Sequence, residues 1–240
     1  MRVAQPGFLD LAGFEKPKYY YRQSLWSQEP MVHLSSISKE NSSYENNNRW
    51  NISETHWNWK AEEQVEVICY TNCEEAELFL NDKSLGIKKL KDFPQYYLTW
   101  EVVFEVGELK VVAKNNDGKT CTYEIYSALN PKTLTMRVDD TELIANGQDM
   151  AHIEIEVIDD NGKLFYLAHN EINLTLEGPG EIIGMENGDP QDLEPYSSRK
   201  RKVYNGKLLV YIRTKTVVGQ IVIKAESKGL EPARLVVNVK

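Results

Sequence analysis

Val65-Glu-Val-Ile-Cys-Tyr70 and Ala76-Glu-Leu-Phe-Leu80 decide the fold class of this chain. In the first stretch Val65, Val67 and Cys69 alternate with the residues between them, and the second stretch repeats the pattern. A period of two is typical of β-strands that bury one face. We therefore predict half-buried strands here.

The same pattern continues toward residue 127. Inward-facing rows are expected at 100–104 and 109–113, a turn at 81–86, and a hairpin at Asn116-Asp-Gly118. No amphipathic stretch is long enough for a helix that crosses between parallel strands. Short strands separated by turn residues favour a β-sandwich.

A second set of strands follows Ala128-Leu-Asn-Pro-Lys132, a short segment with proline that suits a linker. Asp159-Asp-Asn-Gly162 is interpreted as a hairpin turn, because it lacks the remaining ligands of a calcium loop. Six or seven strands are expected, with apolar rows at 134–138, 153–157, 172–176, 208–212, 221–225 and 235–239. This number suits an immunoglobulin-like sandwich.

One short helix is expected before the first sandwich. Pro17 suits a first helical position, Glu15 or a neighbour could cap the entry, and Pro30 closes the segment. Tyr21 and Leu25 stand four residues apart and share a face. Because a helix of about three turns is marginal alone in water, it needs a packing partner.

The predicted fold class is therefore all-β, with two immunoglobulin-like or fibronectin-III-like sandwiches in tandem after one helix. The expected domains are 1–30, 31–128 and 131–240. Residues 35–55 are rich in Ser and Asn without a period, so they are predicted to be a polar loop inserted in the first sandwich.

Composition excludes several partners and cofactors. The formal charge of -8 and the pI near 5.2 argue against nucleic acid or an anionic membrane as partner. No apolar run approaches the roughly 20 residues of a spanning helix. The three cysteines lack C-x-x-C spacing, so we expect free thiols, no zinc and no other cofactor.

The chain offers no arrangement that favours catalysis. Neighbouring acids such as Glu62-Glu63, Glu74-Glu75 and Asp139-Asp140 are best interpreted as solvated charges, since 36 acidic residues produce such pairs by chance. Neither a Gly-x-Ser-x-Gly motif nor a supported Cys–His arrangement occurs. We expect no catalytic residue and no metal site, with histidines scattered at His33, His56, His152 and His169.

Aromatic and basic residues leave two questions open. Trp57 and Trp59 could stack on sugar rings, or could pack between the helix and the first sandwich, and packing is the commoner role of such rings. Arg199-Lys-Arg-Lys202 is most simply a solvated turn before a strand.

Two stretches carry a resemblance to a known family. Gly7 to Trp26, followed by Pro30 to Leu34 and His56 to Trp59, resembles the junction in family 2 glycoside hydrolases of the β-galactosidase type. There the catalytic (β/α)8 barrel ends and accessory β-sandwiches begin. By this resemblance residues 1–30 are the last loop and helix of a barrel, and the rest of the barrel is missing.

The second stretch is Ile183-Gly-Met-Glu-Asn-Gly-Asp-Pro190, continuing to Tyr204-Asn-Gly206. It looks like the long Asn-Gly-Asp-Pro loop in the last sandwich of the same enzymes. The family more often has glycine at the position of Glu186 and phenylalanine at those of Tyr196 and Tyr204. From the residues themselves, Asn187-Gly188 supplies a turn and Pro190 fixes the exit.

The resemblance implies non-catalytic C-terminal domains that support the barrel, border the active site or mediate oligomer contacts. Both catalytic glutamates of the family precede the matching region, so the chain is expected to be inactive alone. The resemblance also implies a periplasmic or secreted bacterial parent that acts on carbohydrate. Without its barrel, the N-terminal helix would expose aromatic surface or cover it with a neighbour, for example in a homodimer.

Two alternatives remain open at this point. One is a carbohydrate-binding module built on the second sandwich, with acids and tyrosines near residues 187–204 as ligand groups. The other is a structural immunoglobulin-like spacer of a surface protein, which gives the Tyr-rich helix no role.

Overall fold

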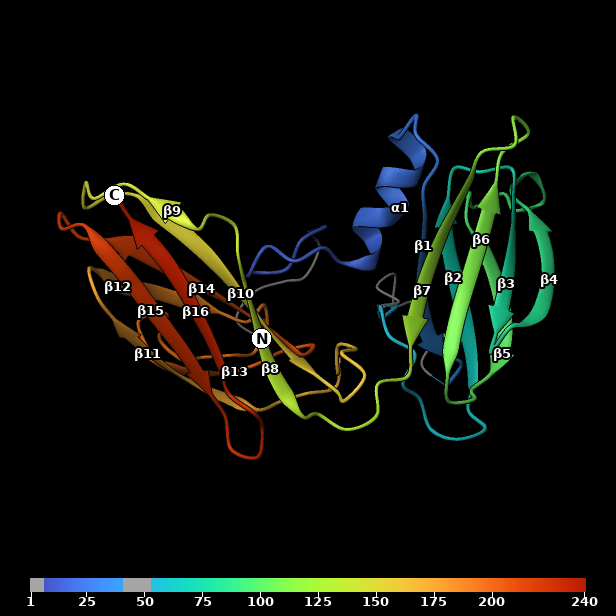
Figure 1. Cartoon of the computed structure of the whole chain (residues 1–240). Helices are drawn as coiled ribbons and strands as arrows, with labels where there is room; N and C mark the ends of the chain where they lie inside the picture. The colour runs from blue at the N-terminus through green and yellow to red at the C-terminus, as the bar shows by residue number, and fades with distance from the viewer. Residues whose placement is uncertain (1–6, 41–52) are drawn as a thin grey trace. The chain divides into compact units, whose positions relative to one another are not determined.

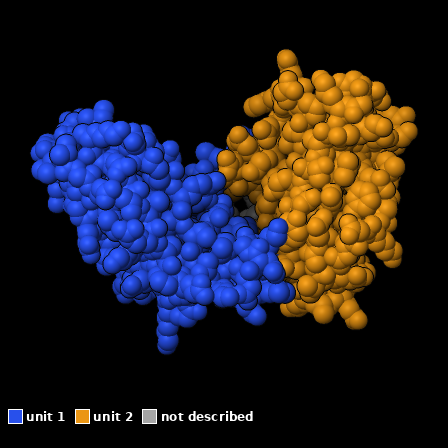
Figure 2. Space-filling view, in the orientation of Figure 1, with its two compact units in different colours: residues 1–14, 128–240 blue, residues 15–127 orange. Residues whose placement is uncertain are grey.

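The computed structural model describes residues 7–40 and 53–240. The chain forms two compact units, one of Glu15–Ser127 and one that combines Met1–Phe14 with Ala128–Lys240 (Figure 2). Each unit is built on two β-sheets, and the helix α1 (Pro17–Trp26) belongs to the first (Figure 1). The prediction of an all-β chain with two sandwiches and a short helix is confirmed.

The first sandwich packs a three-stranded sheet, β1-β2-β5, on a four-stranded sheet, β4-β3-β6-β7. Its strands are β1 (Val32–Ser38), β2 (Gln64–Thr71), β3 (Glu75–Leu80), β4 (Lys83–Lys89), β5 (Leu98–Val103), β6 (Glu108–Lys114) and β7 (Thr120–Tyr126), with a 3-10 turn η2 (Leu90–Asp92) before β5. Neighbouring strands run antiparallel. Val65, Val67 and Cys69 are buried between the sheets, as their alternation predicted.

Two predicted loops of this sandwich are shorter than expected. The turn at 81–86 contracts to Asn81 and Asp82, because both adopt positive φ and close a two-residue hairpin between β3 and β4. Most of β4 is exposed, so its sequence does not alternate. The loop expected from residue 35 begins later, because β1 continues to Ser38 with all seven of its residues buried. Much of the remaining expected insertion lies outside the described residues.

The second sandwich packs the sheet β12-β14-β10-β8 on the sheet β13-β11-β15-β16-β9. Its strands are β8 (Thr133–Val138), β9 (Glu142–Leu143), β10 (Met150–Ile158), β11 (Glu171–Glu177), β12 (Gly180–Glu186), β13 (Lys200–Lys202), β14 (Lys207–Thr214), β15 (Gly219–Glu226) and β16 (Ala233–Val239). The short strand β9 runs parallel to β16. Alternating side chains from both sheets fill the core, among them Ile153, Leu174, Val210 and Ile223.

The region around the predicted Asn-Gly-Asp-Pro loop contains two strands that the sequence did not predict. Gly180–Glu186 is the strand β12, with a register shift between Ile182 and Gly184, so the loop itself begins at Asn187. Lys200–Lys202 is the strand β13, paired with β11. The interpretation of this basic run as a solvated turn is wrong, because Arg201 is buried.

Helix α1 begins at Pro17, as predicted. No side chain caps its first turn, so the suggested Glu15 cap is not formed. A short uncapped helix depends on tertiary packing for its stability. That packing comes from β1 and β2.

Candidate functional site

Two clusters contain the residues that the sequence singled out. The helix junction joins α1 to the first sandwich, and the Asn-Gly-Asp-Pro loop (residues 187–190) lies on the second.

The helix junction is built by aromatic stacking. The Tyr20 ring lies flat on the His33 ring of β1, with centroids 3.5 Å apart and planes 6° apart. Tyr123 of β7 contacts the same histidine, with centroids 4.5 Å apart. Tyr21 contacts Tyr70 of β2 and donates a hydrogen bond to the Gln95 carbonyl. The tyrosines of α1 therefore supply the packing partner that the short helix needs.

The chain just after α1 is fixed by one side chain. The Asn72 amide group donates to the carbonyls of Ser27 at 3.0 Å and Glu29 at 2.8 Å. Its oxygen accepts the Met31 N–H at 2.9 Å. Because Asn72 follows β2 directly, these bonds attach the connection between α1 and β1 to the sheet.

His33 is a packing residue in this junction. It is almost fully buried, and burial lowers its pKa to about 3. Its Nε2 lies 3.3 Å from the Thr55 hydroxyl. An imidazole with this pKa stays neutral at physiological pH and does not serve as a proton shuttle there.

Trp57 and Trp59, which could either stack on sugars or pack, both lie in the first sandwich, Trp57 in its core and Trp59 packed against it. Trp57 is fully buried, packs on Phe104 and donates its indole N–H to the Glu105 carbonyl at 3.0 Å. This burial leaves the ring no free face for a sugar. Trp59 is half-buried and donates to the Ser36 hydroxyl, also at 3.0 Å. Sugar binding by Trp59 stays a prediction.

His56 packs beside Trp59. Its ring contacts Trp59 with centroids 4.7 Å apart, and its Nδ1 accepts the Asn58 N–H at 3.0 Å. Burial lowers the pKa of His56 to about 4. His33 and His56, the two histidines in the stretches that resemble the family, therefore both pack as neutral rings.

The Asn-Gly-Asp-Pro loop is held by buried polar groups. The Glu186 carboxylate accepts the N–H groups of Asn187 at 2.9 Å and Gly188 at 3.0 Å. The Asn187 amide donates to the Asp192 carboxylate and to the Lys202 carbonyl, both at 2.9 Å. These bonds fix the loop between β12 and β13.

Arg201 is the central charge of this network. Its side chain is fully buried and donates to Asp192 at 2.8 Å and to the Glu194 carbonyl at 2.5 Å. The Glu186 carboxylate lies 3.9 Å away, and the Tyr196 ring centroid lies 5.5 Å from the guanidinium carbon. One guanidinium thus compensates the buried Glu186 carboxylate and the largely covered Asp192 carboxylate.

Residues 7–14 pack on this loop. A Cβ added to Gly188 would lie 2.2 Å from an Asp10 carboxylate oxygen, so the two segments touch. Asp10 also accepts the N–H groups of Ala12 and Phe14, at 2.8 and 2.9 Å, which fixes the turn between them. The Lys207 ammonium lies 5.0 Å from the centroid of the Phe14 ring. Sequence reasoning missed Asp10, because nothing in its local pattern points to residues so far along the chain.

The neighbouring surface of β10 and β14 carries paired charges. Lys207 bonds Glu154 at 2.6 Å and Glu156 at 3.0 Å. Burial opposes the charge of Lys207, but the two glutamates outweigh it and raise its pKa. Burial, together with Glu186 and Asp10, raises the pKa of Tyr211. Charged groups therefore surround the attachment of residues 7–14.

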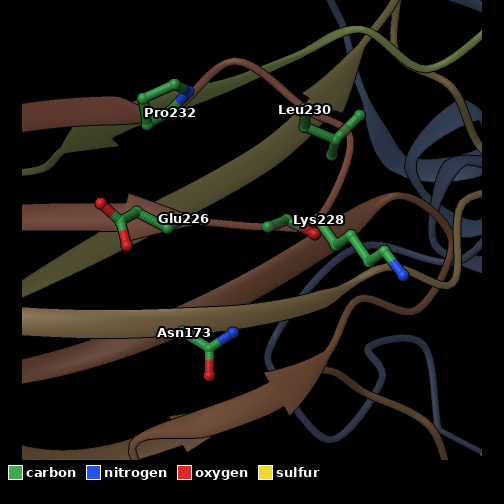
Figure 3. Close-up of a pocket in the computed structure, with 6 residues that line it drawn as sticks. Asn173, Glu226, Lys228, Leu230 and Pro232 are labelled. Atoms are coloured by element: carbon green, nitrogen blue, oxygen red, sulfur yellow. The ribbon is translucent and has the colours of Figure 1, made fainter.

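A pocket of about 380 Å³ lies at one end of the second sandwich (Figure 3). Asn173 of β11 and Glu226 of β15 are register partners and line it together with Lys228 in the following turn. Leu230 and Pro232 supply its apolar part. The polar groups could donate and accept hydrogen bonds to a hydroxylated ligand.

Within residues 7–40 and 53–240, no three His, Cys, Asp or Glu side chains are placed to hold a metal ion. Asp159, the residue that suggested calcium, instead accepts the N–H groups of Leu129, Asn161 and Lys163 at 2.9–3.0 Å. Among the described helices, none combines the length and apolar character required to span a bilayer.

Two family models match the two sandwiches. Glycoside hydrolase family 2 C-terminal domain 5 matches residues 134–236 of the second sandwich. A domain of unknown function, DUF4982, matches residues 62–122 of the first.

Curated relatives match nearly the whole chain. A beta-galactosidase of Bacteroides ovatus is 34% identical over 235 residues, which are 98% of this chain and 25% of that protein. A putative beta-glucuronidase of Formosa agariphila is 31% identical over 216 residues, 86% of this chain and 19% of that protein. The chain thus spans about a quarter or less of the length of these relatives, so it matches one part of larger proteins.

Solved structures agree. A glycosyl hydrolase family 2 member from Bacteroides cellulosilyticus superposes with a TM-score of 0.90 at 30% identity, over 98% of this chain and 32% of that one. A beta-glycosidase from Bacteroides vulgatus gives a TM-score of 0.85 at 27% identity, over 97% of this chain and 28% of that one. The chain therefore belongs to glycoside hydrolase family 2 and corresponds to the C-terminal accessory region of its members.

Proposed function

We propose that the chain is the C-terminal support of a family 2 glycoside hydrolase whose catalytic region cleaves a β-linked sugar. The observation that carries this proposal is the match of 98% of the chain to a quarter of a beta-galactosidase. The chain would contribute no catalytic residue, and its role would be to hold the end of the catalytic region.

The division of the N-terminal stretch supports this role. Residues 7–14 belong to the unit of the second sandwich, whereas α1 is packed on the first. A catalytic region that ends in these segments would be anchored in both units. Apolar side chains remain exposed on both segments: Phe8, Leu9 and Leu11 on the first, and Tyr19, Leu25 and Trp26 on the second. Exposed apolar groups of this kind suit contact with another domain.

The substrate class that we propose is a β-galactoside, because the Bacteroides ovatus relative is a beta-galactosidase. A β-glucuronide is the second candidate, because the Formosa agariphila relative carries that putative activity.

Complementation tests this proposal. The catalytic region of a parent enzyme would be produced without this region, and the present chain would be added in trans. We expect no hydrolysis of nitrophenyl β-galactoside by the chain alone, weak activity of the catalytic region alone, and recovery when both are mixed. Trp26→Ser and Leu25→Ser should weaken the recovery, whereas Lys119→Ala, in the exposed turn between β6 and β7, should not. Turnover by the chain alone, or full activity of the catalytic region without it, would overturn the proposal.

Self-association is a second consequence that we propose for the chain by itself. Trp26 is 76% exposed and adjoins Leu25, so burying both against a second copy removes apolar surface from water. Sedimentation should show a concentration-dependent dimer, and Trp26→Ser should make it monomeric. A monomer at all accessible concentrations would refute this.

A carbohydrate-binding role is the alternative function, and the pocket beside Asn173 and Glu226 favours it. Binding to a polysaccharide affinity gel that disappears with Asn173→Ala and Glu226→Ala would support this role over a purely supporting one. Unretarded migration on gels of plant and host glycans would exclude it.

A further inference from the structure

Two of the three cysteines meet in the first sandwich. The Sγ atoms of Cys73 and Cys121 lie 3.7 Å apart, and both residues are free thiols. This distance is a van der Waals contact between two sulfurs. The residues are 48 positions apart in the sequence, so only the fold brings them together.

The topology explains the meeting. Cys73 lies in the short connection that leaves β2 at Thr71 and enters β3 at Glu75, which takes the chain from one sheet to the other. Its N–H donates to the Thr71 hydroxyl at 3.1 Å, which fixes the connection. Cys73 is fully buried at this edge of the core.

Cys121 approaches from the other side. It stands on the edge strand β7 opposite Ala113 of β6, and Ala113 stands opposite Ala76 of β3. Across β7, β6 and β3, Cys121 is thus followed by two alanines, Ala113 and Ala76. Because these side chains are only methyl groups, they leave room for the sulfur of Cys121 to reach that of Cys73. Cys121 itself is half-buried, so a small reagent can reach its sulfur.

We propose that Cys73 and Cys121 are a disulfide-forming site, oxidised by a small disulfide such as glutathione disulfide. A disulfide requires the sulfurs at about 2 Å, so they must approach by less than about 2 Å, which is within the range of side-chain rotation. The bond would link the crossover between the two sheets to the edge strand β7. Cys69 has no place in the bond and stays a free thiol.

The exchange proceeds in two balanced steps. The Cys121 thiolate attacks one sulfur of glutathione disulfide, forms a mixed disulfide and releases one glutathione thiolate. The Cys73 thiolate then attacks the Cys121 sulfur and releases the second glutathione. The two protons lost by the cysteines end on the two glutathione thiols, so the protein is oxidised by two electrons and one glutathione disulfide is reduced.

The environment makes the first step slow near neutral pH. Burial, and to a smaller extent the neighbouring Cys73 thiol, raise the pKa of Cys121 to about 12. Because the thiolate is the nucleophile, the rate should rise about tenfold per pH unit while the pH stays below this pKa.

Thiol counting on the full chain tests the proposal. After incubation with glutathione disulfide and unfolding in guanidinium chloride, we expect Ellman's reagent to titrate one thiol in place of the chain's three, and the mass to fall by about 2 Da. A digest without reductant should contain the peptides of Cys73 and Cys121 joined. The melting temperature followed by tryptophan fluorescence should rise by about 10 °C, because the bond closes a long loop.

Variants separate the cysteines. Cys121→Ala should abolish the loss of thiols, and Cys73→Ala should stop the exchange at a glutathione adduct on Cys121. Cys69→Ala should leave the disulfide and titrate no free thiol. The peptide map of the unchanged chain decides the matter if a variant does not fold. In the unchanged chain, three thiols after oxidation, a joined peptide that contains Cys69, or a stable glutathione adduct on Cys121 would overturn the proposal.

Discussion

Replacing Arg201 with alanine should strongly destabilise the second sandwich. The change removes the bond to Asp192 at 2.8 Å and the bond to the Glu194 carbonyl at 2.5 Å. Hydrogen bonds to charged groups are worth roughly 1.5–3 kcal/mol each, so the two bonds together account for about 3–6 kcal/mol. Breaking a buried ion pair by removing one partner costs about the same, roughly 3–5 kcal/mol, because the buried Glu186 carboxylate and the largely covered Asp192 carboxylate lose their cation.

The chain carries a built-in probe for this measurement. All five tryptophans lie in the unit Glu15–Ser127, so tryptophan fluorescence reports the unfolding of the first sandwich alone. Far-ultraviolet circular dichroism reports both units. With a urea dependence of about 2 kcal/mol/M, a loss of about 4 kcal/mol lowers a midpoint by about 2 M. That shift should appear in circular dichroism while the fluorescence transition stays in place.

Lys202→Ala is the matched control for Arg201→Ala. Lys202 stands on the same strand with the same charge, but its side chain is exposed and the bond to Asn187 uses its backbone carbonyl. For Lys202→Ala, the free energy of unfolding is expected to change by at most about 0.5 kcal/mol. If Arg201→Ala and Lys202→Ala behaved alike, Arg201 would be a solvated charge and the buried network would contribute nothing.

Three further predictions concern other parts of the chain. Because burial lowers the pKa values of His33 and His56 to about 3 and 4, the unfolded state binds more protons between these values and about 6.5. The free energy of unfolding of the first sandwich should therefore be highest above about pH 6.5 and should be lower by about 2 kcal/mol per histidine at pH 5. His33→Gln should reduce this loss, as measured by urea unfolding followed by tryptophan fluorescence. Gly188→Ala should lower the free energy of unfolding much more than Gly162→Ala, because both positions have positive φ but only Gly188 lies against Asp10. Equal shifts of the two variants' urea midpoints, followed by circular dichroism, would contradict that contact. Trp57→Ala should cost about 3–5 kcal/mol in urea unfolding, whereas Trp26→Ala should change stability little, and the reverse order would place the wrong tryptophan in the core.

The strands that alternate clearly could be predicted from the sequence. Val65, Val67 and Cys69 of β2 and Ile153, Ile155 and Val157 of β10 are buried as their period required. The edge strand β4 was missed because most of its side chains are exposed, which removes the alternation. The end of β1 was assigned to the loop 35–55 because serines at 35, 36 and 38 are typical of a loop, although the sheet buries them.

The candidate site was less accessible to sequence reasoning. The Asn-Gly-Asp-Pro loop was recognised, but the ion that stabilises it, Arg201, was hidden in a run of four basic residues. Inward and outward positions in that run carry the same charge, so no pattern distinguishes them. The partnership of Asp10 with Gly188 depends on tertiary structure alone, and no local signal could have indicated it.

The contact between Asp10 and Gly188 also has a consequence for biosynthesis. The two residues are 178 positions apart (188 minus 10), and ribosomes add about 5–20 residues per second. Asp10 therefore leaves the ribosome roughly 10–35 s before the residue against which it packs. The whole of Glu15–Ser127 is synthesised in this interval and is free to fold first. Residues 7–14 stay without their packing partner until β12 and the loop after it leave the ribosome, and chaperones can bind them during that time.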